Sequence, residues 1–108
     1  PLKQCNAQST NGPMVIERLS FMVSPDYKTD DFIDADAKVW NGWLQQKRGY
    51  LRKTATVYPG GRVDLRIYWD SQKNLDAASK DPEIPALDVK LRATFLGVYS
   101  RLDPVVKK

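Results

Sequence analysis

The sequence predicts one α+β domain of β-α-β-β-α-β order, with helices on one face of a four-stranded antiparallel sheet. Four segments alternate apolar and polar residues, as half-buried strands do, and two longer segments repeat apolar residues at helical spacing. The length of 108 residues fits a single domain. This element order is that of the ferredoxin-like fold, in which the second sheet face has no helices.

The predicted strands are bounded by turn-forming residues. The first runs from Met14 to Val23, and its core-facing positions alternate along it: Val15, Leu19, Phe21 and Val23. Strands over 50–58 and 62–69 are joined at Pro59-Gly60-Gly61, where glycine supplies the positive φ of a tight hairpin. Residues 98–103 form the last predicted strand, which Pro104 closes.

Two main helices are predicted from apolar spacing and end signals. Residues 28–47 form the first, and one broad apolar stripe contains Phe32, Ile33, Ala37, Val39, Trp40, Trp43 and Leu44. Gly49 is its expected stop. Asp70-Ser71 is a candidate cap for a short helical turn through Ala78. Asp81-Pro82-Glu83 predicts the start of the second main helix, which Gly97 ends.

Composition separates a polar arm, residues 1–13, from a domain spanning 14–106. The net charge of +4 comes from interleaved acids and bases, which argues against nucleic-acid binding. No apolar run approaches a membrane span, so only peripheral membrane association remains open. The lone Cys5 permits no intrachain disulfide, and the start at Pro1 suggests a processed N-terminus.

The sheet face without helices is expected to need a partner. Ile16, Met22 and Tyr68 would lie there beside Arg18 and Arg66, and this face is too apolar to remain in water. We therefore predict a homodimer or a place in a larger complex. The interface candidates are Arg18, Met22, Arg66 and Tyr68. The arginines at 18, 66 and 101 would either bind an anion or form salt bridges between subunits.

Several chemistries are excluded by residues that the chain lacks. There is no histidine, which removes His-dependent acid–base and nucleophilic catalysis and a proximal haem ligand. One cysteine cannot form a zinc finger or an iron–sulfur cluster. No phosphate-binding glycine fingerprint is present. We predict no metal site and no cofactor, and the balance leans away from an enzyme.

Two acids stand among apolar residues. Glu17 lies on the core-facing side of the first strand, and Asp36 lies within the apolar helix stripe. Since these faces meet, both acids are expected in one cavity. Each is either a pocket acid with a raised pKa or a structural carboxylate held by an arginine, an indole N–H or backbone amides. The aromatic residues Trp40, Trp43, Trp69 and Tyr99 either line a pocket for a flat ligand or belong to the core.

A set of short segments resembles a family of small cyanobacterial and algal-plastid proteins. The matching residues are Val15-Ile16-Glu17, Asp36 with Trp40, Gly49-Tyr50-Leu51, Trp69 with Ser71, and Gly97 with Tyr99. That family in turn resembles the antibiotic-biosynthesis monooxygenase superfamily. The resemblance implies a dimeric α/β barrel. This sequence departs from the family at Arg18, where Trp is usual.

Two functions follow from the resemblance and the residues. The favoured expectation is a non-enzymatic interaction or accessory domain, as a subunit of a photosynthetic thylakoid complex in a plastid. The alternative is a cofactor-independent monooxygenase or small aromatic-ligand binder, and the alternative location is cytoplasmic.

Overall fold

The structure, a computed structural model, describes residues 13–102. The predicted N-terminal arm and residues 103–106 of the predicted domain therefore lie almost wholly outside the described part. Its elements in chain order are β1 (Val15–Val23), α2 (Thr29–Gln45), β2 (Tyr50–Val57), β3 (Arg62–Trp69), α3 (Gln72–Ser79), α4 (Ile84–Thr94) and β4 (Tyr99–Leu102). The predicted α+β class and the β-α-β-β-α-β order of the main elements along the chain are confirmed, and the short helical turn after β3 is the separate helix α3.

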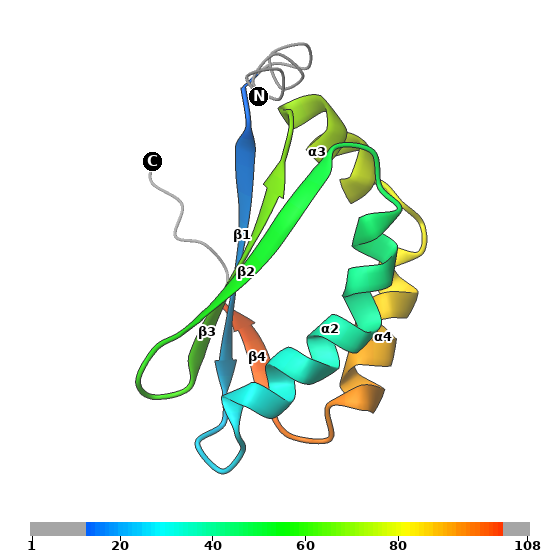
Figure 1. Cartoon of the computed structure of the whole chain (residues 1–108). Coiled ribbons are helices and arrows are strands. Elements are labelled where there is room, and N and C mark those ends of the chain that lie inside the picture. The colour runs from blue at the N-terminus through cyan, green and yellow to red at the C-terminus, as the bar shows by residue number, and fades with distance from the viewer. Residues whose placement is uncertain (1–12, 103–108) are drawn as a thin grey trace, which may run out of the picture.

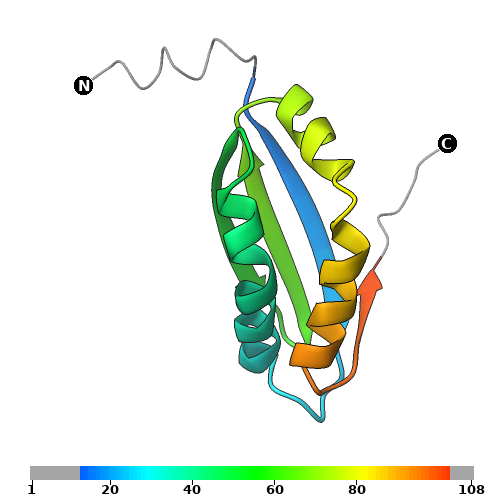
Figure 2. The same ribbon diagram turned by 90° about the vertical axis from the view of Figure 1, so that its right-hand side faces the viewer.

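The four strands form one antiparallel sheet of order β2-β3-β1-β4. Among residues 13–102 the three helices all lie on one face, and none of them covers the other (Figure 1). Turned by 90°, α2 and α4 lie side by side across the sheet (Figure 2). The strand β4 pairs only with Ser20–Val23 of β1, so the first half of β1 has no neighbour at this edge among residues 13–102.

Turn and cap chemistry explains most element ends. Gly61 has φ +99°, and a Cβ there would lie 2.3 Å from the Val23 carbonyl oxygen, so the hairpin requires glycine. The Ser71 hydroxyl accepts a hydrogen bond from the Asn74 amide at 3.2 Å and caps α3 as predicted. The expected start of α4 at Asp81 was wrong, because the helix begins at Ile84 and the Asp81 carboxylate is held by α2.

The core consists of two clusters between helices and sheet. The first is aromatic, with Phe32 at 5.0 Å from Phe21, 5.4 Å from Phe95 and 5.0 Å from Tyr99 between ring centroids. The second gathers around the fully buried Trp69, with Leu44, Ile67 and Ala78. The predicted alternation of β3 is confirmed, since Val63, Leu65, Ile67 and Trp69 are all buried.

The sheet face opposite the helices, here called the open face, is partly apolar and rich in arginine. Ile16 and Met22 are 48% and 37% exposed on it. Arg18 and Arg66 are directly opposite one another on β1 and β3. Two further arginines have local partners: Arg52 stacks 3.8 Å from the Tyr68 ring centroid, and Arg62 makes two 3.0 Å hydrogen bonds to Asp64. The Arg62 hydrogen bonds lower the pKa of Asp64.

Candidate functional site

A cavity of about 330 Å³ lies between the helices and the sheet. Every element contributes to its wall. All six residues predicted for a pocket line it: Glu17, Asp36, Trp40, Trp43, Trp69 and Tyr99. The expectation that the two acids share one cavity is therefore met in the structure. Whether these residues bind a ligand stays a prediction.

Asp36 is 4% exposed and paired with a lysine from the sheet. Lys53 of β2 donates a hydrogen bond from Nζ to Asp36 Oδ2 and a second, of 3.0 Å, to Asn41 Oδ1. Burial raises the pKa of Asp36, and Lys53 opposes that rise through its charge and its hydrogen bond. The pair thus places a basic carboxylate and a compact cation together in the cavity wall.

Glu17 is held by an indole rather than by an arginine. Trp69 Nε1 donates a 3.1 Å hydrogen bond to Glu17 Oε1 across the neighbouring strands β3 and β1. An indole N–H, which was one of the partners expected for this carboxylate, therefore binds it. Within residues 13–102 the second oxygen of Glu17 makes no hydrogen bond, so it remains able to accept one from a ligand.

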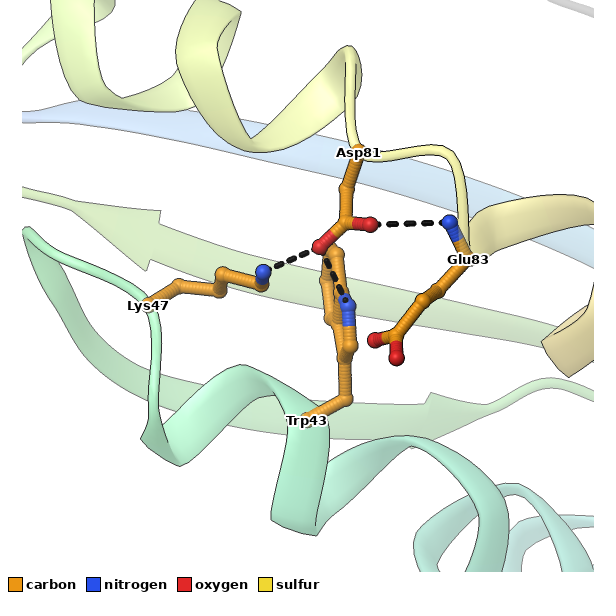
Figure 3. Close-up of polar contacts among 4 residues, drawn as sticks. All are labelled: Trp43, Lys47, Asp81 and Glu83. Carbon is orange, nitrogen blue, oxygen red and sulfur yellow. Dashed lines mark hydrogen bonds and ion pairs between the residues drawn. The ribbon is translucent and has the colours of Figure 1, made fainter.

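The indole of Trp43 is fixed from the connection between α3 and α4 (Figure 3). Trp43 Nε1 donates a 3.0 Å hydrogen bond to Asp81 Oδ2, which also accepts from Lys47, while the Glu83 amide donates to Asp81 Oδ1 at 2.8 Å. The Lys47 hydrogen bond is the main cause that lowers the pKa of Asp81. The Trp40 ring packs edge-on against the Trp43 ring, with 5.4 Å between the two centroids. The hydrogen bond from Trp43 to Asp81 therefore helps to hold both rings in place.

Tyr99 of β4 contributes its phenol ring to the wall of the cavity. Burial raises its pKa, so its hydroxyl stays protonated at neutral pH and can donate a hydrogen bond. The Arg92 guanidinium lies 4.9 Å from its ring centroid. Tyr99 therefore joins the aromatic core to the polar residues of α4.

Three polar residues of the site were missed or underrated from the sequence: Lys53, Asp88 and Arg92. A usable signal existed for Lys53. The Gly60-Gly61 hairpin fixes the register of β2 on β3, and that register pairs Lys53 with the core residue Ile67. Asp88 and Arg92 lie on the exposed side of α4, where the sequence pattern alone shows only a solvated face.

Within residues 13–102, no group of three or more acidic, histidine or cysteine side chains is arranged to hold a metal ion. None of the helices in this same part of the chain is long and apolar enough to cross a membrane.

Comparison with known proteins finds likeness in structure. No family model and no curated protein matches the sequence. SnoaB, a cofactor-independent oxygenase from Streptomyces nogalater, is 14% identical with a TM-score of 0.61, over 89% of this chain and 97% of its own. The Streptomyces coelicolor monooxygenase ActVA-Orf6, solved with nanaomycin D, is 15% identical with a TM-score of 0.62, over 89% and 93%. A proposed antibiotic biosynthesis monooxygenase from Caulobacter crescentus is 19% identical with a TM-score of 0.56, over 87% and 92%.

These neighbours correct the favoured expectation about function. The prediction of a non-enzymatic accessory domain in a photosynthetic complex was wrong, because the solved structures similar to this chain include proteins described as an oxygenase and as monooxygenases. The resemblance to the antibiotic-biosynthesis monooxygenases is confirmed at the level of structure, because this chain has their ferredoxin-like fold. The resemblance to cyanobacterial and algal-plastid proteins stays a prediction.

Proposed function

We propose that this protein binds a flat, electron-rich aromatic molecule in the cavity and oxygenates it without a cofactor. The observation that carries the proposal is a cavity of about 330 Å³ lined by three tryptophans and a tyrosine, with a buried carboxylate–lysine pair in its wall. Its volume falls at the lower end of the range usual for small-molecule sites. The oxygenases that share the fold support the same reading.

Oxygenation of this kind requires a substrate that itself supplies electrons to dioxygen. A ring CH₂ group activated by neighbouring phenol and ketone groups meets that requirement. Loss of one proton gives a delocalised carbanion, which reduces O₂. The CH₂ group becomes C=O with one oxygen atom, and the other oxygen leaves in water with the two hydrogens, so no external reductant is consumed.

The Asp36–Lys53 pair suits the first step of this reaction. Burial raises the pKa of Asp36, which makes its carboxylate a stronger base than an exposed aspartate. The Lys53 ammonium lies beside it and would stabilise negative charge that develops on a substrate oxygen. The indoles of Trp40 and Trp69 would hold the rings in place.

The first prediction concerns binding and turnover of 1,8-dihydroxyanthrone, a three-ring phenol with one such CH₂ group. We expect its quinone product to quench tryptophan fluorescence saturably, because three tryptophans line the cavity. With the anthrone, we expect O₂ uptake above the spontaneous rate, at one O₂ per quinone formed. Trp40→Leu should weaken both signals about 10-fold or more, as expected for the loss of one stacking ring.

Tyr58→Leu is the matched control, since Tyr58 stacks on Arg62 away from the cavity. It should leave quenching and O₂ uptake unchanged. Saturable quenching without accelerated O₂ uptake would reduce the protein to an aromatic-ligand binder. Absence of both signals would refute the cavity as a site for such molecules.

We further propose that the open face pairs with the same face of a second copy. Its exposed Ile16 and Met22 favour removal from water. The arginines of the open face oppose this pairing, because its strands carry four of them and one aspartate: Arg18, Arg52, Arg62 and Arg66, with Asp64. Two identical faces of this charge repel one another.

The second prediction is therefore that dimerisation tightens as salt is added. Screening between about 0.05 and about 0.5 M salt shortens the range of the repulsion, so the dimer dissociation constant should fall. Arg66→Gln should tighten the dimer at low salt and reduce this dependence, whereas Arg48→Gln, in the connection between α2 and β2 rather than on a strand, should not. Sedimentation equilibrium measures both effects, and a dimer that weakens with salt would contradict the proposed interface.

A further inference from the structure

A second hollow of the surface, here called the basic cleft, lies beside helix α3 and has a volume of about 590 Å³. Its walls are α3, the connection from α2 to β2 and the connection from α3 to α4. The charged residues that line it are Lys47, Arg48, Lys73, Lys80 and Asp81. Among residues 13–102 only Ala78 lines both this cleft and the cavity, so the basic cleft is a separate candidate site.

The fold concentrates positive charge in the basic cleft. Acids and bases are interleaved along the chain, and the whole sequence has a net charge of +4. The cleft brings four cationic side chains together with one carboxylate, which leaves an excess of three positive charges there. A concave surface lined by one sign of charge raises the local concentration of ions of the opposite sign. The cleft is therefore expected to attract anions.

Only one of these cations is neutralised by a carboxylate within residues 13–102. Lys47 forms an ion pair with Asp81 (Figure 3). The side chains of Arg48, Lys73 and Lys80 make no ion pair and no hydrogen bond in this part of the chain. Their N–H donors are therefore available to a bound anion.

The two sides of the basic cleft are fixed to one another by close packing. Gly49 has φ +87°, and a Cβ there would lie 2.5 Å from Asp70 Oδ1 and 2.6 Å from Asn74 Cβ. The Asp70 amide donates a 2.8 Å hydrogen bond to the Gly49 carbonyl, and Asn74 Nδ2 donates one of 2.8 Å to Asp70 Oδ1. The backbone beside Arg48 is thus held against α3, so the cleft does not have to form when a ligand arrives.

We propose that the basic cleft binds a small oligophosphate, an anion of two or three linked phosphate groups. Two such groups carry roughly three negative charges at neutral pH, which matches the excess in the cleft. Lysine ammonium groups bind phosphate oxygens as point charges, and arginine adds a planar fork of donors. No aromatic side chain of residues 13–102 lines the cleft, so the charge of the ligand decides its affinity. Binding there is independent of the oxygenation proposed for the cavity.

Calorimetric titration of the whole chain with tripolyphosphate, without divalent cations and at about 0.05 M salt, tests the site. We expect one tripolyphosphate per chain and an affinity about 10-fold or more above that of monophosphate, since more cations are engaged. Adenosine triphosphate carries the same phosphate chain and should bind within about three-fold of tripolyphosphate. Much tighter binding of the nucleotide would show that its base is recognised, and would overturn the assignment to the phosphate chain.

Variants of the cleft should shift this affinity in opposite directions. Arg48→Gln and Lys73→Gln should each weaken tripolyphosphate binding about three-fold. Asp81→Asn should tighten it about three-fold, because the change removes the acid that lines the cleft and releases Lys47. Lys38→Gln is the matched control, since it removes an exposed positive charge of α2 that does not line the cleft, and it should change the affinity little.

The outcomes separate a built site from attraction to the overall charge. Equal weakening by Lys38→Gln and Lys73→Gln would show attraction to the net charge alone and would overturn the site, as would a titration that does not saturate. Tightening by Asp81→Asn would support the site, because a variant that fails to fold does not gain affinity. Thermal unfolding checks that each variant is folded.

Discussion

Replacing Lys53 with methionine is expected to lower the free energy of unfolding by about 3–5 kcal/mol at neutral pH. The methionine fills a similar volume but leaves the Asp36 carboxylate, which is 4% exposed, without its ion-pair partner. Asn41 also loses the 3.0 Å hydrogen bond from Lys53. Urea unfolding of wild-type and variant protein measures the difference.

The loss of unfolding free energy caused by Lys53→Met should be smaller in acid, and the pKa of Asp36 explains why. Burial already raises this pKa, and removing Lys53 takes away the influence that lowers it, so in the variant it rises further. A carboxyl whose pKa is higher in the folded than in the unfolded state binds a proton on folding. Its contribution to stability is therefore present below the unfolded pKa and is lost as pH rises toward the folded pKa. The penalty at about pH 4 should be smaller than at about pH 8.

Two further variants make this prediction sharp. Asp36→Leu combined with Lys53→Met removes both charges and should recover most of the stability, because an apolar pair replaces the ion pair and no unpaired charge is left buried. Lys73→Met, at an exposed position of α3, is the control and should cost little at either pH. A Lys53→Met penalty that stays constant with pH would show that Asp36 does not take up the proton.

The fold was predictable because the strong signals here are local and agree with one another. Alternation in β3, the stripe of α2 and the hairpin glycines each point to the same layered arrangement. The start of α4 was not, since the Asp81 carboxylate accepts hydrogen bonds from Trp43 of α2 and from Lys47 just after it, besides the bond from its neighbour Glu83. A capping residue 38 positions from its partner Trp43 gives no local sign of that contact.

The site was predictable in its apolar part and much less in its charges. Trp40, Trp43 and Trp69 could be placed because helix and strand periodicity decide which way they face. Partners of charged groups depend on long side chains that cross between elements, such as Lys53 reaching Asp36. Asp64 shows the same effect, because the alternation places it on the open face, yet it is 1% exposed beneath the fork of Arg62.

Trp69 is expected to be among the most sensitive positions of the core. It is 1% exposed, is the largest fully buried side chain, and packs with Leu44 and Ile67. Trp69→Ala should therefore cost about 3–5 kcal/mol of unfolding free energy, through lost burial and the hole left behind. Because that variant is at risk of not folding, Trp69→Phe supplies a second measurement with a smaller expected loss.

The Phe variant also isolates the hydrogen bond that orders Glu17. Trp69→Phe keeps an aromatic ring beside Tyr50 but removes the Nε1 donor 3.1 Å from Glu17 Oε1. If this bond stabilises the fold, Trp69→Phe should cost less in a Glu17→Ala background than in wild-type protein, by about 1–3 kcal/mol for a bond to a charged group. The cycle is measured by urea unfolding of the four proteins. A coupling near zero would mean that the indole only fills space, and Glu17 would then be a carboxylate without a structural partner at the cavity wall.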